Sequence, residues 1–323
     1  MALIERPRGD ILHRARTGPP VSNTAMLAVG AGLLAVGLAG LAWRRRAPPL
    51  PRHAPDPWRL CARDFNRSAA MLAASVVADS ALEHFRGNYE NRAMYVAPVT
   101  AAATMAVALS GRAPRGLATV VFGASFVIGA AGLGFHTYNI TKRPGGLSWQ
   151  NLFYAAPFAA PGALALAGLL GLGAAHLPRI RFAAPLKRKQ LAAALAWTMS
   201  ASLMVTASEV WVLHFRGAFH DPFMVLPVTV VPAAAGALAL AGARPNERNL
   251  RLARWLLNVT SLLGFAGVGF HAYGVSRNMG GFKNWSQMLF QGPPLPAPPS
   301  FTGLAIAGLG ALSLLRDNEV RHG

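Results

Sequence analysis

The chain has 323 residues, of which 53% are hydrophobic and only 13% are charged, with 33 Gly and 24 Pro. This composition excludes an ordinary soluble domain, in which about a quarter of the residues are charged. The formal net charge of +19 is compatible with nucleic-acid binding. However, the basic residues lie in short segments between long apolar stretches and form no aromatic-studded basic face, so we expect no nucleic-acid partner.

Apolar stretches recur along the chain, and several alone reach the roughly 20 residues that a helix needs to cross a bilayer. Glycine and proline are common in such helices. In chain order we expect an N-terminal tail (1–24), a transmembrane anchor (25–43), a basic proline-rich linker (44–65), a four-helix unit (66–175), a basic loop (176–189), a second four-helix unit (190–315) and a C-terminal tail (316–323).

An internal repeat supports the division into two units. The tetrapeptide HFRG occurs at 84–87 and again at 214–217, and GLGFHTY at 132–138 matches GVGFHAY at 267–273. Ordered matches over more than 100 residues indicate duplication. The sequence thus predicts an all-α integral membrane protein with about nine transmembrane helices, an anchor plus two four-helix repeats. Because four is an even number, the repeats should be parallel.

The expected helices of the repeats are 66–84, 93–110, 116–137 and 158–175 in the first, and 190–214, 223–241, 251–272 and 298–315 in the second. Between the third and fourth helix of each lies a loop with Gly-Gly, Trp, Leu-Phe and two prolines in the same order (145–161 and 280–298). An interfacial tryptophan favours a segment that folds back at the membrane surface.

The distribution of Lys and Arg predicts the orientation. Twenty of the 31 lie in the segments 44–67, 111–116, 176–190, 243–254 and 316–323, whereas seven lie in the alternating segments. The positive-inside rule puts the first set, with the C-terminus, in the cytoplasm. Both HFRG turns and both GFHxY turns then meet on the outer, periplasmic or extracellular, side. The four arginines of the tail 1–24 oppose this orientation, so the anchor is the least determined helix.

Residues kept in both repeats are the candidates for a site. We interpret two histidines and one carboxylate per repeat as candidate metal ligands, and one arginine and one tyrosine per repeat as candidate cofactor-binding residues. The candidate ligands are His84, His136, His214, His271, Asp79 and Glu209, and the candidate cofactor-binding residues are Arg86, Arg216, Tyr138 and Tyr273. Carboxylates inside a membrane helix are costly and are by default paired or functional.

Four interpretations remain open. The shared residues can be helix ends and packing positions only. They can form a non-haem iron or copper site, for which imidazole and carboxylate are usual ligands, although a five-residue spacing between Asp79 and His84 is unfavourable for chelation by a regular helix. They can bind haem b through two histidines, with glycines at 132 and 134 leaving space and arginines meeting the propionates. They can relay protons in a transporter.

The favoured expectation is a metal- or haem-dependent redox protein, either an oxidoreductase or an electron-transfer protein, with the lipid bilayer and a redox partner or quinone as partners. A transporter or an assembly subunit of a membrane complex is the alternative. The repeats differ near the first histidine, with Glu83 against Leu213 and Glu90 against His220. This difference favours one shared centre over two identical ones.

Overall fold

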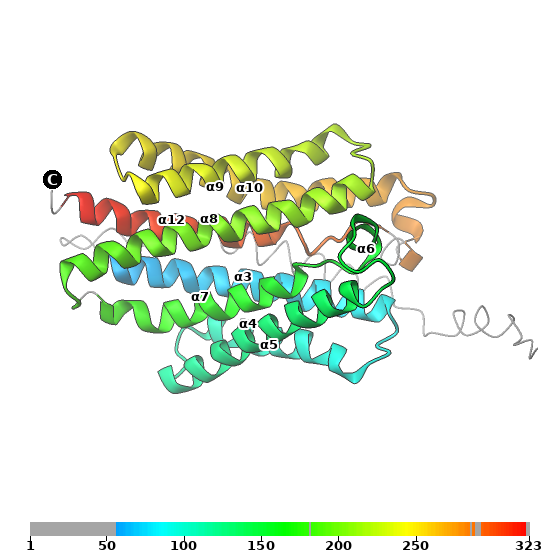
Figure 1. Ribbon diagram of the computed structural model, residues 1–323, viewed down its shortest axis with the longest axis horizontal. Helices are drawn as coiled ribbons and strands as arrows, with labels where there is room; N and C mark the ends of the chain where they lie inside the picture. The colour runs from blue at the N-terminus through cyan, green and yellow to red at the C-terminus, as the bar shows by residue number, and fades with distance from the viewer. Residues whose placement is uncertain (1–55, 181, 285, 288–291, 321–323) are drawn as a thin grey trace, which may run out of the picture.

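The computed structural model describes residues 56–180, 182–284, 286–287 and 292–320, and every regular element within them is a helix (Figure 1). The elements are α3 (Pro57–Arg86), η1 (Arg92–Tyr95), α4 (Val96–Ser110), α5 (Arg115–Thr141), α6 (Trp149–Tyr154), α7 (Ala160–Ile180), α8 (Pro185–Arg216), η2 (Pro222–Val225), α9 (Leu226–Ala243), α10 (Glu247–Arg277), η3 (Gly281–Asn284) and α12 (Pro299–Val320). The predicted tail 1–24 and anchor 25–43 lie outside the described residues.

Seven helical segments are long and apolar enough to cross a membrane: α4 with η1, α5, α7, α8, α9 with η2, α10, and α12. The chain is therefore an all-α membrane protein, as predicted. Large apolar side chains on α5 and α10, such as Val120, Val127 and Leu262, face outward. In a soluble protein such a surface would be an association site, whereas here acyl chains can cover it.

Helix α3 is not among the seven. Its first half carries Arg59, Arg63, Asp64 and Arg67, and its second half carries Asp79, Glu83 and Arg86. It nevertheless lies in the centre of the bundle, packed against α4, α7 and α12. Trp58 and Phe65 of this helix are almost fully buried. The helix is therefore held by contacts with other helices, and its sequence alone does not have the apolarity of a lipid-facing span.

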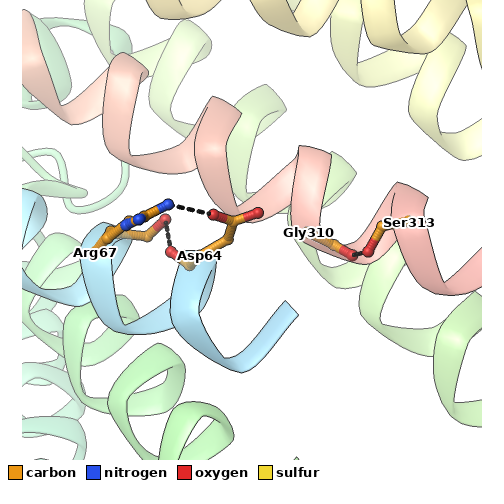
Figure 2. Close-up of polar contacts among 5 residues, drawn as sticks. Asp64, Arg67, Gly310 and Ser313 are labelled. Carbon is orange, nitrogen blue, oxygen red and sulfur yellow. Dashed lines mark hydrogen bonds and ion pairs between the residues drawn. The ribbon is translucent and has the colours of Figure 1, made fainter. Parts of the chain in front are cut away.

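Small residues allow α3 and α12 to approach closely. A Cβ atom at Gly310 of α12 would lie 3.2 Å from Cβ of Asp64 and 3.5 Å from Cα of Cys61. Figure 2 shows this region, with the Arg67–Asp64 ion pair of α3 beside the Gly310–Ser313 turn of α12. Close backbone approach is the usual way in which helices associate within a membrane, where burial from water supplies no driving force.

Most helices extend beyond their predicted boundaries; α5 continues to Thr141, α10 to Arg277, and α12 to Val320, within the predicted C-terminal tail 316–323. The linker predicted over 44–65 ends earlier, since α3 begins at Pro57, where Asp56 accepts a hydrogen bond from the Trp58 N–H. Proline is favoured in the first helical turn because its missing N–H has no partner there in any case. The loop predicted over 176–189 is also shorter, because α7 continues to Ile180 and α8 begins at Pro185.

The turns that follow α3, α5, α8 and α10 all lie at one end of the bundle, at the right of Figure 1. Helix α12 packs against α3, α8 and α10, while α7 packs mainly against α3 and α5. The polar residues shared by the two halves are therefore gathered at one end of the molecule, on helices that extend across the bundle.

Candidate functional site

The two HFRG turns have the same backbone conformation. Helix α3 ends at Arg86 and helix α8 at Arg216, and the following glycine N–H bonds back to the carbonyl four residues earlier. The next two residues have positive φ in both turns, 56° and 45° in the first and 55° and 47° in the second. Such left-handed backbone at non-glycine residues is uncommon. Helices α3 and α8 therefore end in the same backbone geometry.

The first shared histidine of each half is tied to the turn that follows it. His84 Nδ1 lies 2.6 Å from the carbonyl oxygen of Met94, and His214 Nδ1 lies 2.8 Å from that of Met224. A carbonyl oxygen only accepts hydrogen bonds, so Nδ1 must donate in both rings. A proton therefore sits on Nδ1, and in the neutral ring Nε2 keeps its lone pair.

The second shared histidine is tied to the loop before the last helix of its half. His136 Nδ1 lies 2.7 Å from the carbonyl oxygen of Pro157, and His271 Nδ1 lies 2.8 Å from that of Pro294. The same tautomer follows. Among the described residues, Nε2 of all four shared rings makes no hydrogen bond.

In the second half, His214 lies close enough to His271 for the two to interact electrostatically. Across the described ranges, no three His, Cys, Asp or Glu side chains come together in a group that could hold a metal ion. The three-ligand grouping of two histidines and one carboxylate is thus not assembled among the described residues.

The two arginines hold the loops of the opposite halves. Arg216 of α8 donates to the carbonyl oxygens of Leu152 (2.9 Å) and Ala155 (3.1 Å), and its guanidinium lies over the ring of Phe153. Arg86 of α3 donates to the carbonyl oxygen of Gly292 (3.3 Å). Each arginine thus binds the loop of the opposite half. The sequence did not predict this role.

The two carboxylates have different surroundings. Glu209 Oε2 accepts a hydrogen bond from the Ala159 N–H at 2.8 Å, next to the start of α7, and interacts with Arg216 and His136. A carboxylate at a helix N-terminus satisfies free N–H groups and interacts favourably with the helix dipole. Asp79 Oδ1 is fully buried and has no hydrogen-bond partner among the described residues.

The shared tyrosines are exposed, with 61% of Tyr138 and 55% of Tyr273 accessible. Each tyrosine contacts a nearby cation of its own helix end: Lys142 lies over the Tyr138 ring, and Arg277 lies over the Tyr273 ring and donates to its hydroxyl. These contacts give the tyrosines the character of interfacial residues at the ends of α5 and α10.

Only one glycine of each GxG pair adjoins another helix. A Cβ at Gly132 would lie 2.8 Å from Cβ of Pro161, and one at Gly267 would lie 2.7 Å from Cβ of Pro298. Gly134 and Gly269 have open space around them. The space expected for a haem macrocycle is therefore filled by proline beside Gly132 and Gly267, and it is open beside Gly134 and Gly269.

Sequence reasoning missed the proline and methionine carbonyls that orient the histidines. The signal was present, because Met94 and Pro157 recur as Met224 and Pro294 in the internal repeat. It also missed an aromatic cluster of Trp149 and Phe153 with Trp211 and Phe215, which joins the loop of the first half to α8 of the second. Comparison with known proteins found no matching family model, curated protein or solved structure.

Proposed function

We propose that the chain is a membrane redox protein whose shared histidines bind a metal centre, either a bare ion or the iron of haem b, through Nε2. The observation that carries the proposal is the tethering of all four Nδ1 atoms to backbone carbonyls. Metal-binding histidines almost always donate their second ring N–H in this way, because the bond fixes the tautomer and raises the basicity of the ligand nitrogen.

A two-histidine centre agrees better with the packing than a three-ligand site does. Haem iron needs only two axial imidazoles, and the carboxylate of Glu209 already accepts a hydrogen bond from the Ala159 N–H. Iron or copper held by imidazoles alone needs further ligands from solvent or substrate. In either form the centre would accept one electron from a donor and pass it to an acceptor, such as a quinone or a protein partner.

We further propose one centre in each half. The matching carbonyl tethers of His84 and His136 in the first half and of His214 and His271 in the second support this pairing, in place of the single shared centre that the repeat differences favoured. The proposal includes duplicated parallel four-helix units, nine membrane spans with the anchor 25–43 and α3 counted, and a cytoplasmic C-terminus. The centres would then lie on the outer side.

An optical spectrum combined with metal analysis of the protein in mild detergent tests the proposal. A Soret band that shifts on reduction supports haem, and stoichiometric iron or copper without that band supports a bare ion. Neither signal, after expression with haem precursor and with each metal, would remove the redox proposal in favour of transport or an assembly role. His176→Ala is the matched control, because His176 is not shared between halves and bonds to Thr119.

A further inference from the structure

Asp79 differs from its counterpart Glu209 in what faces it across the helix interface. Glu209 accepts a hydrogen bond from the N–H of Ala159. Counting from the matched prolines Pro157 and Pro294, the residue that replaces Ala159 in the second loop is Pro296. Proline has no N–H. The loop opposite Asp79 therefore cannot offer the donor that its counterpart offers to Glu209.

Hydrogen bonds place this loop alongside Asp79. The Ser75 hydroxyl donates to the carbonyl oxygen of Pro296 at 2.5 Å, and the Arg86 guanidinium donates to that of Gly292. Ser75 lies one helical turn before Asp79, and Arg86 lies two turns after it. The segment 292–296 thus runs along α3 past Asp79, and its Pro-Pro-Leu-Pro sequence carries carbonyl oxygens with few N–H groups.

The stripe of α3 that faces this segment carries more side-chain oxygen atoms than the equivalent stripe of α8. It contains Ser75, Asp79 and Glu83, where the second half has Val205, Glu209 and Leu213. Glu83 is paired with Arg86, with 2.5 Å between the carboxylate and the guanidinium. With both carboxylates ionised, two carboxylates and one guanidinium would leave a net charge of about −1 on this stripe.

We infer that Asp79, with the backbone carbonyls of segment 292–296, forms a binding site for one hard monovalent cation such as Na⁺. Asp79 Oδ1 is buried without a hydrogen-bond donor among the described residues, which is unfavourable for an ionised carboxylate unless a positive charge compensates it. Carboxylate and carbonyl oxygens are the ligands of hard cations, and irregular backbone at membrane depth is a known source of such carbonyls. The site is additional to the proposed redox centres, although segment 292–296 includes Pro294, whose carbonyl oxygen accepts the His271 Nδ1–H.

The test measures thermal unfolding of the full chain in detergent, in NaCl and in choline chloride at equal ionic strength and pH. A ligand that binds only the folded protein raises its stability in a concentration-dependent way. We expect a saturable rise of the melting temperature with Na⁺, together with binding of about one radioactive Na⁺ per chain. Equal melting curves in the two salts and no Na⁺ binding would overturn the inference and would indicate that Asp79 is neutralised by a proton.

Two variants locate the effect. Asp79→Asn removes the charge and should abolish the Na⁺ dependence, whereas Glu209→Gln, the matched change in the other half, should retain it. Persistence of Na⁺ dependence in Asp79→Asn would also overturn the assignment. If Asp79→Asn does not fold, Pro296→Ala decides instead, because the restored N–H competes with Na⁺ for Asp79 and should weaken Na⁺ binding by at least about tenfold, a loss of roughly one hydrogen bond. Unchanged Na⁺ affinity in Pro296→Ala would contradict the site.

Discussion

The four shared histidines owe their ring orientation to backbone carbonyl oxygens. Each carbonyl belongs to a turn or loop that comes after the histidine in the chain. Each hydrogen bond therefore fixes both the ring and the loop that it joins. A histidine substitution should disturb both the proposed centre and the local backbone. This double role is why metal or haem content is a sharper measurement than folding alone for these residues.

Substitution of His84 tests whether each half has its own centre. His84→Ala should remove about half of the bound metal or haem, because the other half keeps both of its imidazole ligands. The double variant with His214→Ala should remove all of it. The measurement is metal or haem content per chain after gel filtration, with His176→Ala as control. Complete loss in the single variant would indicate one centre shared by both halves.

Glu209 should stabilise the fold through the start of α7. Glu209→Ala leaves the Ala159 N–H without its acceptor and removes the charge partner of Arg216. By analogy with other N-terminal caps, the free energy of unfolding should fall by about 1–2 kcal/mol. Thermal unfolding in detergent measures the change. Ser208→Ala, an adjacent exposed substitution, should stay within about 0.5 kcal/mol of the wild type, and equal effects of the two would contradict the assigned role.

At the scale of elements, glycine residues allow neighbouring helices to pack closely, both within a half and between the halves. Gly132 of α5 and Gly267 of α10 face the prolines that open α7 and α12. Gly310 of α12 lies against α3. These contacts are made with residues that lack a side chain, so the helices approach at backbone distance and dispersion contacts between them are strong.

Two neighbouring glycines of α5 provide a matched pair. Gly132→Ala would place its Cβ 2.8 Å from Pro161, and overpacking of this kind costs about 1–3 kcal/mol. Gly134 has open space around it, so Gly134→Ala should be neutral or should stabilise the helix by up to about 1 kcal/mol. Unfolding curves of the two variants in the same detergent measure the difference. Equal destabilisation by both would show that the Pro161 contact does not determine the packing.

The loops before α7 and α12 connect elements of both halves. The first loop is held by His136 of its own half through Pro157 and by Arg216 of the other half through Ala155. The second is held by His271 through Pro294 and by Arg86 through Gly292. These reciprocal contacts bind the halves together at one end of the bundle, next to the proposed centres.

At the scale of the whole molecule, the orientation in the membrane is open to direct measurement. A cysteine at Glu90, an exposed residue of the first HFRG turn, should react with a membrane-impermeant reagent added outside the cell, and one at Arg115 should not. Glu90 is preferable to Asn88 or Ala218, whose positive φ would strain the substitution. The native Cys61 is buried and serves as the unlabelled background. The reverse pattern would place the centres on the cytoplasmic side.

The sequence alone determined the membrane class, because apolar length is a local property that composition reveals without knowledge of the fold. It also singled out the residues shared by the two halves. The two HFRG segments do end their helices in matching turns, whereas the two GFHxY segments, expected to be turns, lie within α5 and α10. The histidines of both segments have matching tethers. Helix ends were less predictable. At Pro57, capping by Asp56 and burial of Trp58 extended α3 into a segment whose prolines favoured a linker.

Only the tertiary structure decided what the shared polar residues contact. Arg86 and Arg216 reach loops 206 and about 60 residues away in sequence, and helical periodicity carries no information about such distant partners. Asp79 and Glu209 occupy equivalent positions in the two halves. Glu209 faces a loop that offers the Ala159 N–H, whereas the loop opposite Asp79 has Pro296 at the equivalent position. Their different roles depend on which backbone groups the opposite half presents, and that is fixed only when the two halves pack together.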